Sequence, residues 1–215
     1  MKILFDCDGT LMDSMHIWID PIKQIENRYK FIPNQEQREF KESASFRGLC
    51  EYYSETFAHD MSADDIENEL YEIIEDGYKN TIKPKNGVVE KIKQLHEQGY
   101  EMGIASSTDK YYLDIIFNRL GISDYFKFIL TPDQTGLRKS DEKYWLKACE
   151  LLDEKPENVV LFDDKIYAVR AAKKVGLKTV GVDDLPHNEE DIELLKKEAD
   201  YYVDSVSEFD MKVFN

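Results

Sequence analysis

The stretch Met1-Lys-Ile-Leu-Phe-Asp-Cys-Asp-Gly-Thr-Leu-Met-Asp-Ser14 decides the fold of this 215-residue chain. Its continuous apolar run, Ile3–Phe5, predicts a strand covered on both faces, as in a parallel sheet. The run ends at Asp6, and because side chains alternate along an extended chain, Asp6 and Asp8 start on the same side. Gly9 then permits a tight turn. Open α/β sheets usually bind their ligands where a parallel strand ends in this way.

The composition indicates a folded, acidic protein. Apolar residues make up 42% of the chain, and its length fits one domain with a large insertion or two modest domains. There are 28 Lys and Arg against 44 Asp and Glu, so the net charge is −16. A surface of this charge repels phosphate backbones and anionic lipid, so we expect neither a nucleic-acid nor a membrane partner.

The cysteines and the termini indicate the compartment. Cys7, Cys50 and Cys149 are too few and too scattered for a disulfide framework or a zinc site. Strand alternation points Cys7 away from the two acids, so it is interpreted as a small buried hydrophobe and not as a nucleophile. The sequence has neither the regions of a signal peptide nor an apolar run of the ~20 residues that span a bilayer. We therefore expect a soluble, cytoplasmic protein.

The chain changes character twice. Residues 15–83 repeat apolar positions at helical spacing without a strand pattern, which predicts an all-helical insertion. From residue 84 onward, helices alternate with short apolar strands, predicted at residues 100–105, 126–130, 159–162, 178–182 and 201–203. This alternation predicts an α/β fold with a doubly wound, Rossmann-like parallel sheet. Residues 1–14 and 84–215 form the predicted core.

Acidic and hydroxyl side chains follow three of the predicted strands. Asp6 and Asp8 follow the first, Ser106 the second, and Asp163 with Asp164 a later one. Parallel strands align these ends along one edge of the sheet, so the groups should converge. Two carboxylates ~4 Å apart repel by ~4 kcal/mol at an effective dielectric of ~20, so four of them need a cation. All-oxygen ligands with vacant positions suit Mg²⁺.

The chain resembles the haloacid dehalogenase superfamily of phosphotransferases. Four segments carry the resemblance in the family's order: Asp6-x-Asp8-Gly-Thr10-Leu-x-Asp-Ser14, Ile104-Ala-Ser106, Gly136-Leu-Arg-Lys139 and Leu161–Gly176. The first and fourth motifs are highly specific, whereas the second and third are weak alone. The helical insertion looks like the mobile cap of the branch that contains β-phosphoglucomutase and phosphoglycolate phosphatase.

The resemblance implies a role for each motif residue. Asp6 matches the nucleophile that forms an aspartyl phosphate, and Asp8 matches the general acid and base. Ser106 matches the hydroxyl that holds the phosphoryl group; the alternative is an ordinary cap of the next helix, a role that Ser107 or Thr108 could fill instead. Lys139 matches the cation that balances carboxylates and phosphate. The implied Mg²⁺ ligands are Asp6, the backbone carbonyl of Asp8, Asp164 and, as ligand or as neighbour of the ligands, Asp163. Substrate contacts are implied for Thr10 and Ser107.

Two positions depart from the family pattern. The third motif often reads Lys-Pro-x-Pro, whereas this chain has Lys139-Ser-Asp-Glu142, which leaves Lys143 as a less favoured alternative cation. Lys165 replaces a small polar residue after the acid pair, and it either adds a charge near the metal or points outward.

The cap contributes a further hypothesis. Its connector Ser43–Gly48 resembles the substrate-specificity loop of related caps. Arg47 is then placed to meet the part of the substrate remote from the phosphoryl group, Gly48 to let the backbone approach, and His16 to add a hydrogen bond. An ordinary surface arginine and a hinge histidine remain equally open alternatives.

The leading interpretation is a Mg²⁺-dependent phosphatase that acts on a small phosphorylated metabolite through an aspartyl phosphate. A sugar-phosphate mutase uses the same residues and differs in how well its cap excludes water. Dehalogenation is disfavoured because that branch lacks the second acid of Asp-x-Asp. A binding module on a retired enzyme core is the alternative from another class, although such modules usually lose a nucleophile or metal ligand. Branch members are often monomers, so we expect a monomer.

Overall fold

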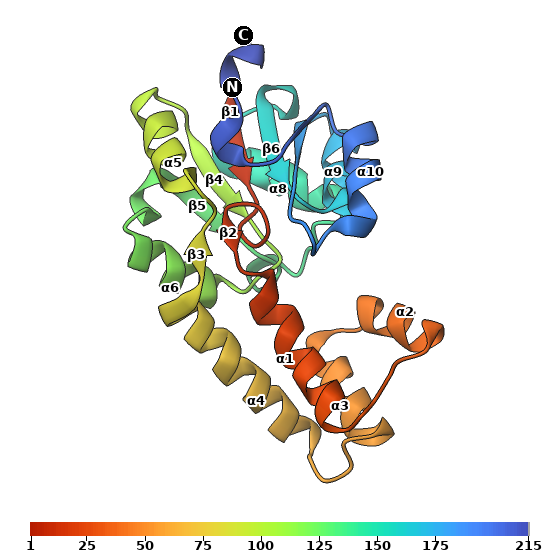
Figure 1. Ribbon diagram of the computed structural model, residues 1–215. Helices are drawn as coiled ribbons and strands as arrows, with labels where there is room; N and C mark the ends of the chain where they lie inside the picture. The colour runs from red at the N-terminus through yellow and green to blue at the C-terminus, as the bar shows by residue number, and fades with distance from the viewer. Residues whose placement is uncertain (215) are drawn as a thin grey trace. The chain divides into compact units, whose positions relative to one another are not determined.

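The computed structural model describes residues 1–214, apart from the side chains of Glu39, Glu42 and Ser43. The chain divides into two compact units (Figure 1). Met1–Met15 and Ile82–Asn215 form the core unit, and His16–Thr81 form the cap unit. Within the described residues, no helix combines the length and the apolar character needed to cross a membrane.

A six-stranded parallel sheet organises the core unit. Its strand order is β5 (Phe126–Leu130), β4 (Met102–Ala105), β1 (Lys2–Phe5), β6 (Val159–Asp163), β7 (Lys178–Val182) and β8 (Tyr201–Val203). The sheet grows outward from β1, first through β4 and β5 and then through β6, β7 and β8. The predicted α/β doubly wound fold is confirmed, and the direction of growth reverses at β1, where such sheets bind ligands.

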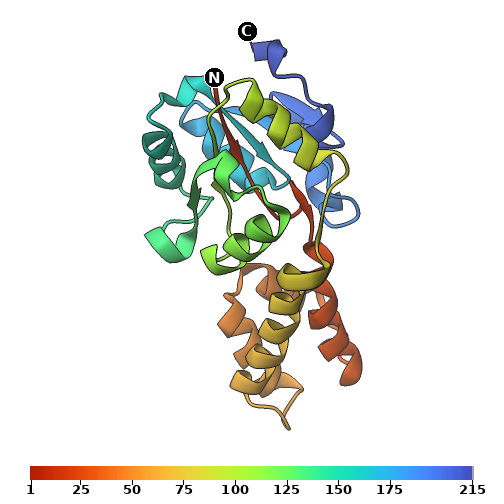
Figure 2. The same cartoon turned by 90° about the vertical axis from the view of Figure 1, so that its left-hand side faces the viewer.

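Helices cover both faces of this sheet, as Figures 1 and 2 show for α5 and α6 on one side and α9 and α10 on the other. The helices are α5 (Val88–Glu97), α6 (Lys110–Leu120), α7 (Pro132–Thr135), α8 (Glu142–Leu152), α9 (Ile166–Lys174) and α10 (Glu189–Glu198). Leu4 packs in one cluster with Trp145 of α8 and Ala168 of α9. The next residue, Phe5, stacks on Phe162 in the opposite layer. Strand β1 is therefore buried on both faces, as its apolar run predicts.

Two short elements of the core unit were not predicted. Met12–Asp13 (β2) and Lys83–Pro84 (β3) form an antiparallel ribbon. A strand of two residues is too short to show a periodic pattern in the sequence. Pro84 predicts the end of a regular element, although an edge strand tolerates a proline. The connection between β5 and α8 contains the one-turn helix α7, which begins at Pro132.

The regular elements of the cap unit are all helices among its described residues. Its elements are α1 (Met15–Arg28), α2 (Gln35–Ser43), α3 (Phe46–Thr56), α4 (Ala63–Asp76) and the π-helix η1 (Gly77–Thr81). Buried Ile25, Tyr53 and Leu70 belong to its own apolar core.

The structure corrects the connector predicted at Ser43–Gly48. The segment ends one helix and begins the next: α2 includes the backbone of Ser43, whose side chain lies outside the described residues, and α3 starts at Phe46. Ser45 caps α3 by accepting a hydrogen bond from the backbone N–H of Gly48. Arg47 and Gly48 are therefore helical residues, because the small-residue composition that suggested a loop is also that of a helix cap.

Candidate active site

Polar side chains at the carboxyl ends of three strands lie together in the core unit. Asp6 and Asp8 follow β1, Ser106 follows β4, and β6 ends at Asp163 with Asp164 directly after it. All five are buried, with at most 8% of each exposed. One carboxylate oxygen each of Asp6, Asp163 and Asp164 lies within 4.8 Å of the other two. The parallel sheet therefore concentrates acids that are far apart in sequence.

Lys139, whose side chain is 1% exposed, is a buried cation inside this cluster. Its Nζ lies 2.9 Å from Asp6 Oδ1 and 2.5 Å from Asp163 Oδ2. Burial by itself lowers the pKa of Lys139, but Asp163 and Asp6 raise it well above the usual value, so the ammonium stays charged. Trp145 Nε1 donates to the backbone carbonyl of Lys139 at 2.8 Å and holds this segment in place. Lys143, the alternative cation, is exposed.

Burial dominates the electrostatics of the two acids that contact Lys139. It raises the pKa of Asp6 well above the usual value; Lys139 opposes this shift, and Asp163, Asp164 and Asp8 add to it. The pKa of Asp163 is also raised by burial, again against the effect of Lys139. An ionised Asp6 therefore depends on the positive charge beside it.

Asp8 is held by two hydroxyl groups. Ser14 Oγ donates to its Oδ1 at 2.6 Å, and Thr108 Oγ1 donates to its Oδ2 at 2.7 Å. A hydroxyl can donate or accept, so both contacts can persist when Asp8 carries a proton. The sequence suggested Thr108 only as a helix cap. The position of Thr108, three residues after β4, could have indicated this contact from the sequence, because the end of β4 lies next to β1.

The two serines after β4 have different surroundings. Ser106 is buried, and its Oγ accepts a hydrogen bond from the backbone N–H of Thr108 at 3.2 Å. Ser107 is exposed; burial raises the pKa of Tyr167 of α9, a residue that is 45% exposed, and the side chain of Ser107 lowers this pKa. Ser106 is thus turned into the site, whereas Ser107 and Tyr167 lie nearer its surface.

The acid pair after β6 divides its contacts. Asp163 Oδ1 accepts a hydrogen bond from the backbone N–H of Lys165 at 2.9 Å, and Oδ2 faces Lys139, so both of its oxygens have protein partners. Asp164 Oδ1 accepts from Thr10 Oγ1 at 3.2 Å, and Oδ2 lies 2.9 Å from Nζ of Lys165. Thr10, predicted to contact substrate, therefore contacts the acid of the implied metal site. Lys165 adds a charge there instead of pointing outward.

The donor set fits a divalent cation. Oδ2 of Asp163 and Oδ2 of Asp164 are buried and accept no aligned hydrogen bond. Lys139 and Lys165 lie within ion-pair distance of these oxygens, so their charge is partly balanced while lone pairs stay open. Gly9 has φ of +81°, and a Cβ there would lie 2.8 Å from Asp164 Oδ2. Buried carboxylate oxygens with a glycine beside them suit a small, hard cation such as Mg²⁺.

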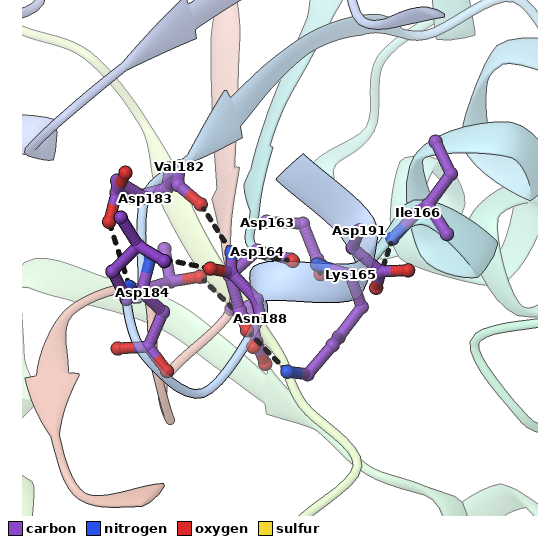
Figure 3. Close-up of polar contacts among 12 residues, drawn as sticks. Asp163, Asp164, Lys165, Ile166, Val182, Asp183, Asp184, Asn188 and Asp191 are labelled. Carbon is purple, nitrogen blue, oxygen red and sulfur yellow. Dashed lines mark hydrogen bonds and ion pairs between the residues drawn. The ribbon is translucent and has the colours of Figure 1, made fainter. Parts of the chain in front are cut away.

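One acid of this region was not singled out from the sequence. Asp184 follows β7, is 5% exposed, and lies with its Oδ1 2.9 Å from Lys85 Nζ. Asn188 ties its loop to the acid pair: its Oδ1 accepts from the backbone N–H of Asp184, and its Nδ2 donates to the carbonyl of Asp164 (Figure 3). Burial raises the pKa of Asp184 to about 6; Lys85 lowers it and Asp164 raises it further. Its place after a predicted strand was the signal that could have found it.

The substrate contacts predicted in the insertion, His16, Arg47 and Gly48, all belong to the cap unit. His16 is half-buried on α1. The guanidinium of Arg47, in a side chain that is 43% exposed, forms ion pairs with acids of α3 and α4, namely Glu51, Asp64 and Glu67 at 3.0, 2.5 and 2.8 Å. These carboxylates raise the pKa of Arg47. A substrate phosphate would have to compete with all three for this cation.

We expect Arg47→Ala to lower the thermal midpoint of unfolding, because α3 and α4 lose the cation that both contact. The variant should change turnover of a small generic phosphomonoester and of any larger substrate by the same factor, within about threefold. Thermal denaturation and paired kinetics measure the two effects, with the exposed Lys23→Ala as control. A loss confined to the larger substrate would instead assign Arg47 to substrate binding.

Cys7 takes no part in this chemistry. It is fully buried, and burial, with Asp8 and Asp6 adding to the effect, raises the pKa of its thiol well above the usual value. A protonated thiol is a poor nucleophile. The interpretation of Cys7 as a buried hydrophobe is confirmed by its burial.

Curated proteins of similar sequence include pyrophosphatases named PpaX. The protein of that name from Anoxybacillus flavithermus is 29% identical over 182 residues, which cover 84% of this chain and 82% of the relative. The one from Bacillus cereus strain G9842 is 25% identical over 180 residues with the same coverage.

Solved structures show the same fold at lower identity. A β-phosphoglucomutase from Clostridium difficile aligns over 99% of this chain and 94% of its own with a TM-score of 0.71 and 20% identity. A predicted phosphoglycolate phosphatase from Haemophilus somnus aligns over 100% and 97% with a TM-score of 0.76 and 15% identity. The sequence model of one family, described as Haloacid dehalogenase-like hydrolase, matches residues 3–182. The motifs, the sheet and this match agree, and the chain belongs to the haloacid dehalogenase-like hydrolases.

Proposed function

We propose that this protein is a Mg²⁺-dependent phosphatase that hydrolyses a small phosphorylated metabolite through an aspartyl phosphate on Asp6. The observation that carries the proposal is the buried Asp6 carboxylate, paired with Lys139 at 2.9 Å and two residues from Asp8. Lys139 lowers the pKa of Asp6 against the effect of burial and so favours the ionised carboxylate, which is the nucleophilic form. The phosphatase and mutase names among the similar proteins support the same reaction class.

The reaction has two balanced steps. In the first, an oxygen of Asp6 attacks phosphorus, the bond to the leaving oxygen breaks, and Asp8 gives that oxygen its proton. In the second, Asp8 removes a proton from water, the water oxygen attacks phosphorus, and the bond between phosphorus and the Asp6 oxygen breaks, so that inorganic phosphate leaves and Asp6 is regenerated. The hydroxyls of Ser14 and Thr108 orient Asp8 in both protonation states.

The cation would be held by Asp6, the backbone carbonyl of Asp8 and Asp164. When bound, Mg²⁺ would neutralise charge on the phosphoryl oxygens. Lys139 favours the ionised form of Asp6, and Asp163 holds Lys139 in place. Ser106 would hydrogen-bond the phosphoryl group, and Thr10 orients Asp164. The buried, free cysteines support a reducing compartment such as the cytoplasm.

Exhaustive chelation is expected to abolish phosphate release from p-nitrophenyl phosphate, and added Mg²⁺ should restore it. Ca²⁺ should inhibit, because it takes more ligands in a looser geometry than in-line attack by Asp6 tolerates. The measurement is initial rate against free metal concentration. Full activity of the chelated protein would contradict the metal requirement.

A panel of phosphorylated metabolites identifies the substrate class. Inorganic pyrophosphate belongs in it because the curated relatives carry the name pyrophosphatase. Glucose 1-phosphate tests the mutase alternative: a mutase yields an isomeric sugar phosphate, whereas a phosphatase releases phosphate. A protein that binds panel members but turns over none would be a binding module.

A further inference from the structure

The loop after β7 brings a fourth strand end to the site. Asp184 is 5% exposed, and its Oδ2 is a buried oxygen without a hydrogen-bond partner. Its Oδ1 is held by Lys85, and its backbone N–H donates to Asn188. Lys85 balances part of the charge of this carboxylate through Oδ1, but Oδ2 itself accepts no hydrogen bond, and a buried oxygen in that state costs free energy.

Gly9 shows where this oxygen points. A Cβ on Gly9 would lie 2.8 Å from Asp184 Oδ2 and 2.8 Å from Asp164 Oδ2. Two carboxylate oxygens on separate loops therefore flank the same point of the turn between Asp6 and Thr10. Figure 3 shows Asp184 beside the acid pair, joined to it through Asn188.

Lys165 is the reason why the cation site would need a further acid. Its ammonium lies 2.9 Å from Asp164 Oδ2 and so cancels charge on a carboxylate that would hold the cation. Lys165 also interacts electrostatically with Asp184. A site that loses one negative charge to a lysine needs another to keep its affinity for a divalent cation.

We propose that Asp184 is an additional acid of the cation site, contributed by the loop after β7, and that it offsets the positive charge of Lys165. This inference rests on the proposed function, because it concerns the same cation. Lys85 holds Oδ1 of Asp184 and Asn188 holds its backbone N–H, so the unpartnered Oδ2 is kept on the Gly9 side of the site, where its charge opposes that of Lys165.

The test is equilibrium binding of Mn²⁺ to the metal-free full-length protein, followed through the electron paramagnetic resonance signal of free Mn²⁺, without substrate. Asp184→Asn is expected to weaken binding by about tenfold or more, as for other residues that support metal ligands. Asp183→Asn is the matched control. Asp183 is the neighbouring acid, but its carboxylate accepts from Tyr202 and from the backbone of Leu185, so its variant should bind within about twofold of wild type.

Lys165 supplies a second arm, whose single variant leaves Asp184 intact. Lys165→Met should tighten Mn²⁺ binding, and the double variant Asp184→Asn/Lys165→Met should return to within about threefold of wild type. This arm decides the question if Asp184→Asn fails to fold: unchanged binding by Lys165→Met then overturns the inference. Unchanged binding by folded Asp184→Asn also overturns it and leaves the proposed function standing. A wild-type protein that binds no Mn²⁺ overturns both.

Discussion

Asp6→Asn is expected to lower phosphate release by about 10⁴-fold or more while the protein stays folded. The amide has nearly the same shape as the carboxylate, but it cannot attack phosphorus to form the acyl phosphate. Asp6 is buried, its Oδ1 faces Lys139, and asparagine retains an oxygen that can accept from that ammonium. The fold should therefore tolerate the change, and the loss should fall on kcat.

The measurement combines steady-state kinetics on p-nitrophenyl phosphate with circular dichroism and thermal denaturation. Asp124→Asn is the matched control, because Asp124 is an exposed acid in the 3₁₀ turn Ser123–Tyr125 of the core unit. It should keep wild-type activity. Substantial turnover by pure Asp6→Asn protein would rule out Asp6 as the nucleophile.

Lys139→Met is expected to remove activity and to destabilise the protein by about 3–5 kcal/mol, because it leaves Asp6 and Asp163 buried without their shared cation. For a protein of this size, the midpoint of thermal unfolding should fall by on the order of 10 °C. Lys143→Met is the control, since Lys143 lies shortly after Lys139 in the first turn of α8 and is exposed.

The destabilisation should depend on pH with a definite sign. Burial already raises the pKa of Asp6 and of Asp163, and Lys139 opposes both shifts, so removing it raises both pKa values further. A carboxyl group whose pKa is higher in the folded state favours folding at low pH, and this stability is lost as pH rises through the folded pKa. In metal-free protein, urea denaturation should show a smaller deficit for Lys139→Met at pH 5 than at pH 8. An equal deficit at both values would mean that the two acids are not the cause.

The local pattern of the sequence determined the fold class and the edge of the sheet that carries the chemistry. Apolar runs such as Ile3–Phe5 and Val159–Phe162, separated by helical periodicities, predicted a doubly wound parallel sheet, and the structure confirms it. The prediction of the sheet succeeds because a strand that is buried on both faces needs a continuous run of apolar residues. The acids at the strand ends could be found for the same reason, since alternation and parallel alignment are regular geometry. The family followed from motif spacing and is confirmed by the sequence model that matches residues 3–182.

Only the tertiary structure decided which side chains pair. Thr108 donates to Asp8 across the β1–β4 boundary, Lys165 contacts Asp164, and Asp184 enters from the loop after β7. Arg47, read from sequence as part of a connector, is instead a helical residue paired with three carboxylates. The physical reason is range: periodicity and strand ends reflect steric preferences of adjacent residues, whereas these contacts join segments whose distance depends on register, loop path and the packing of the whole core.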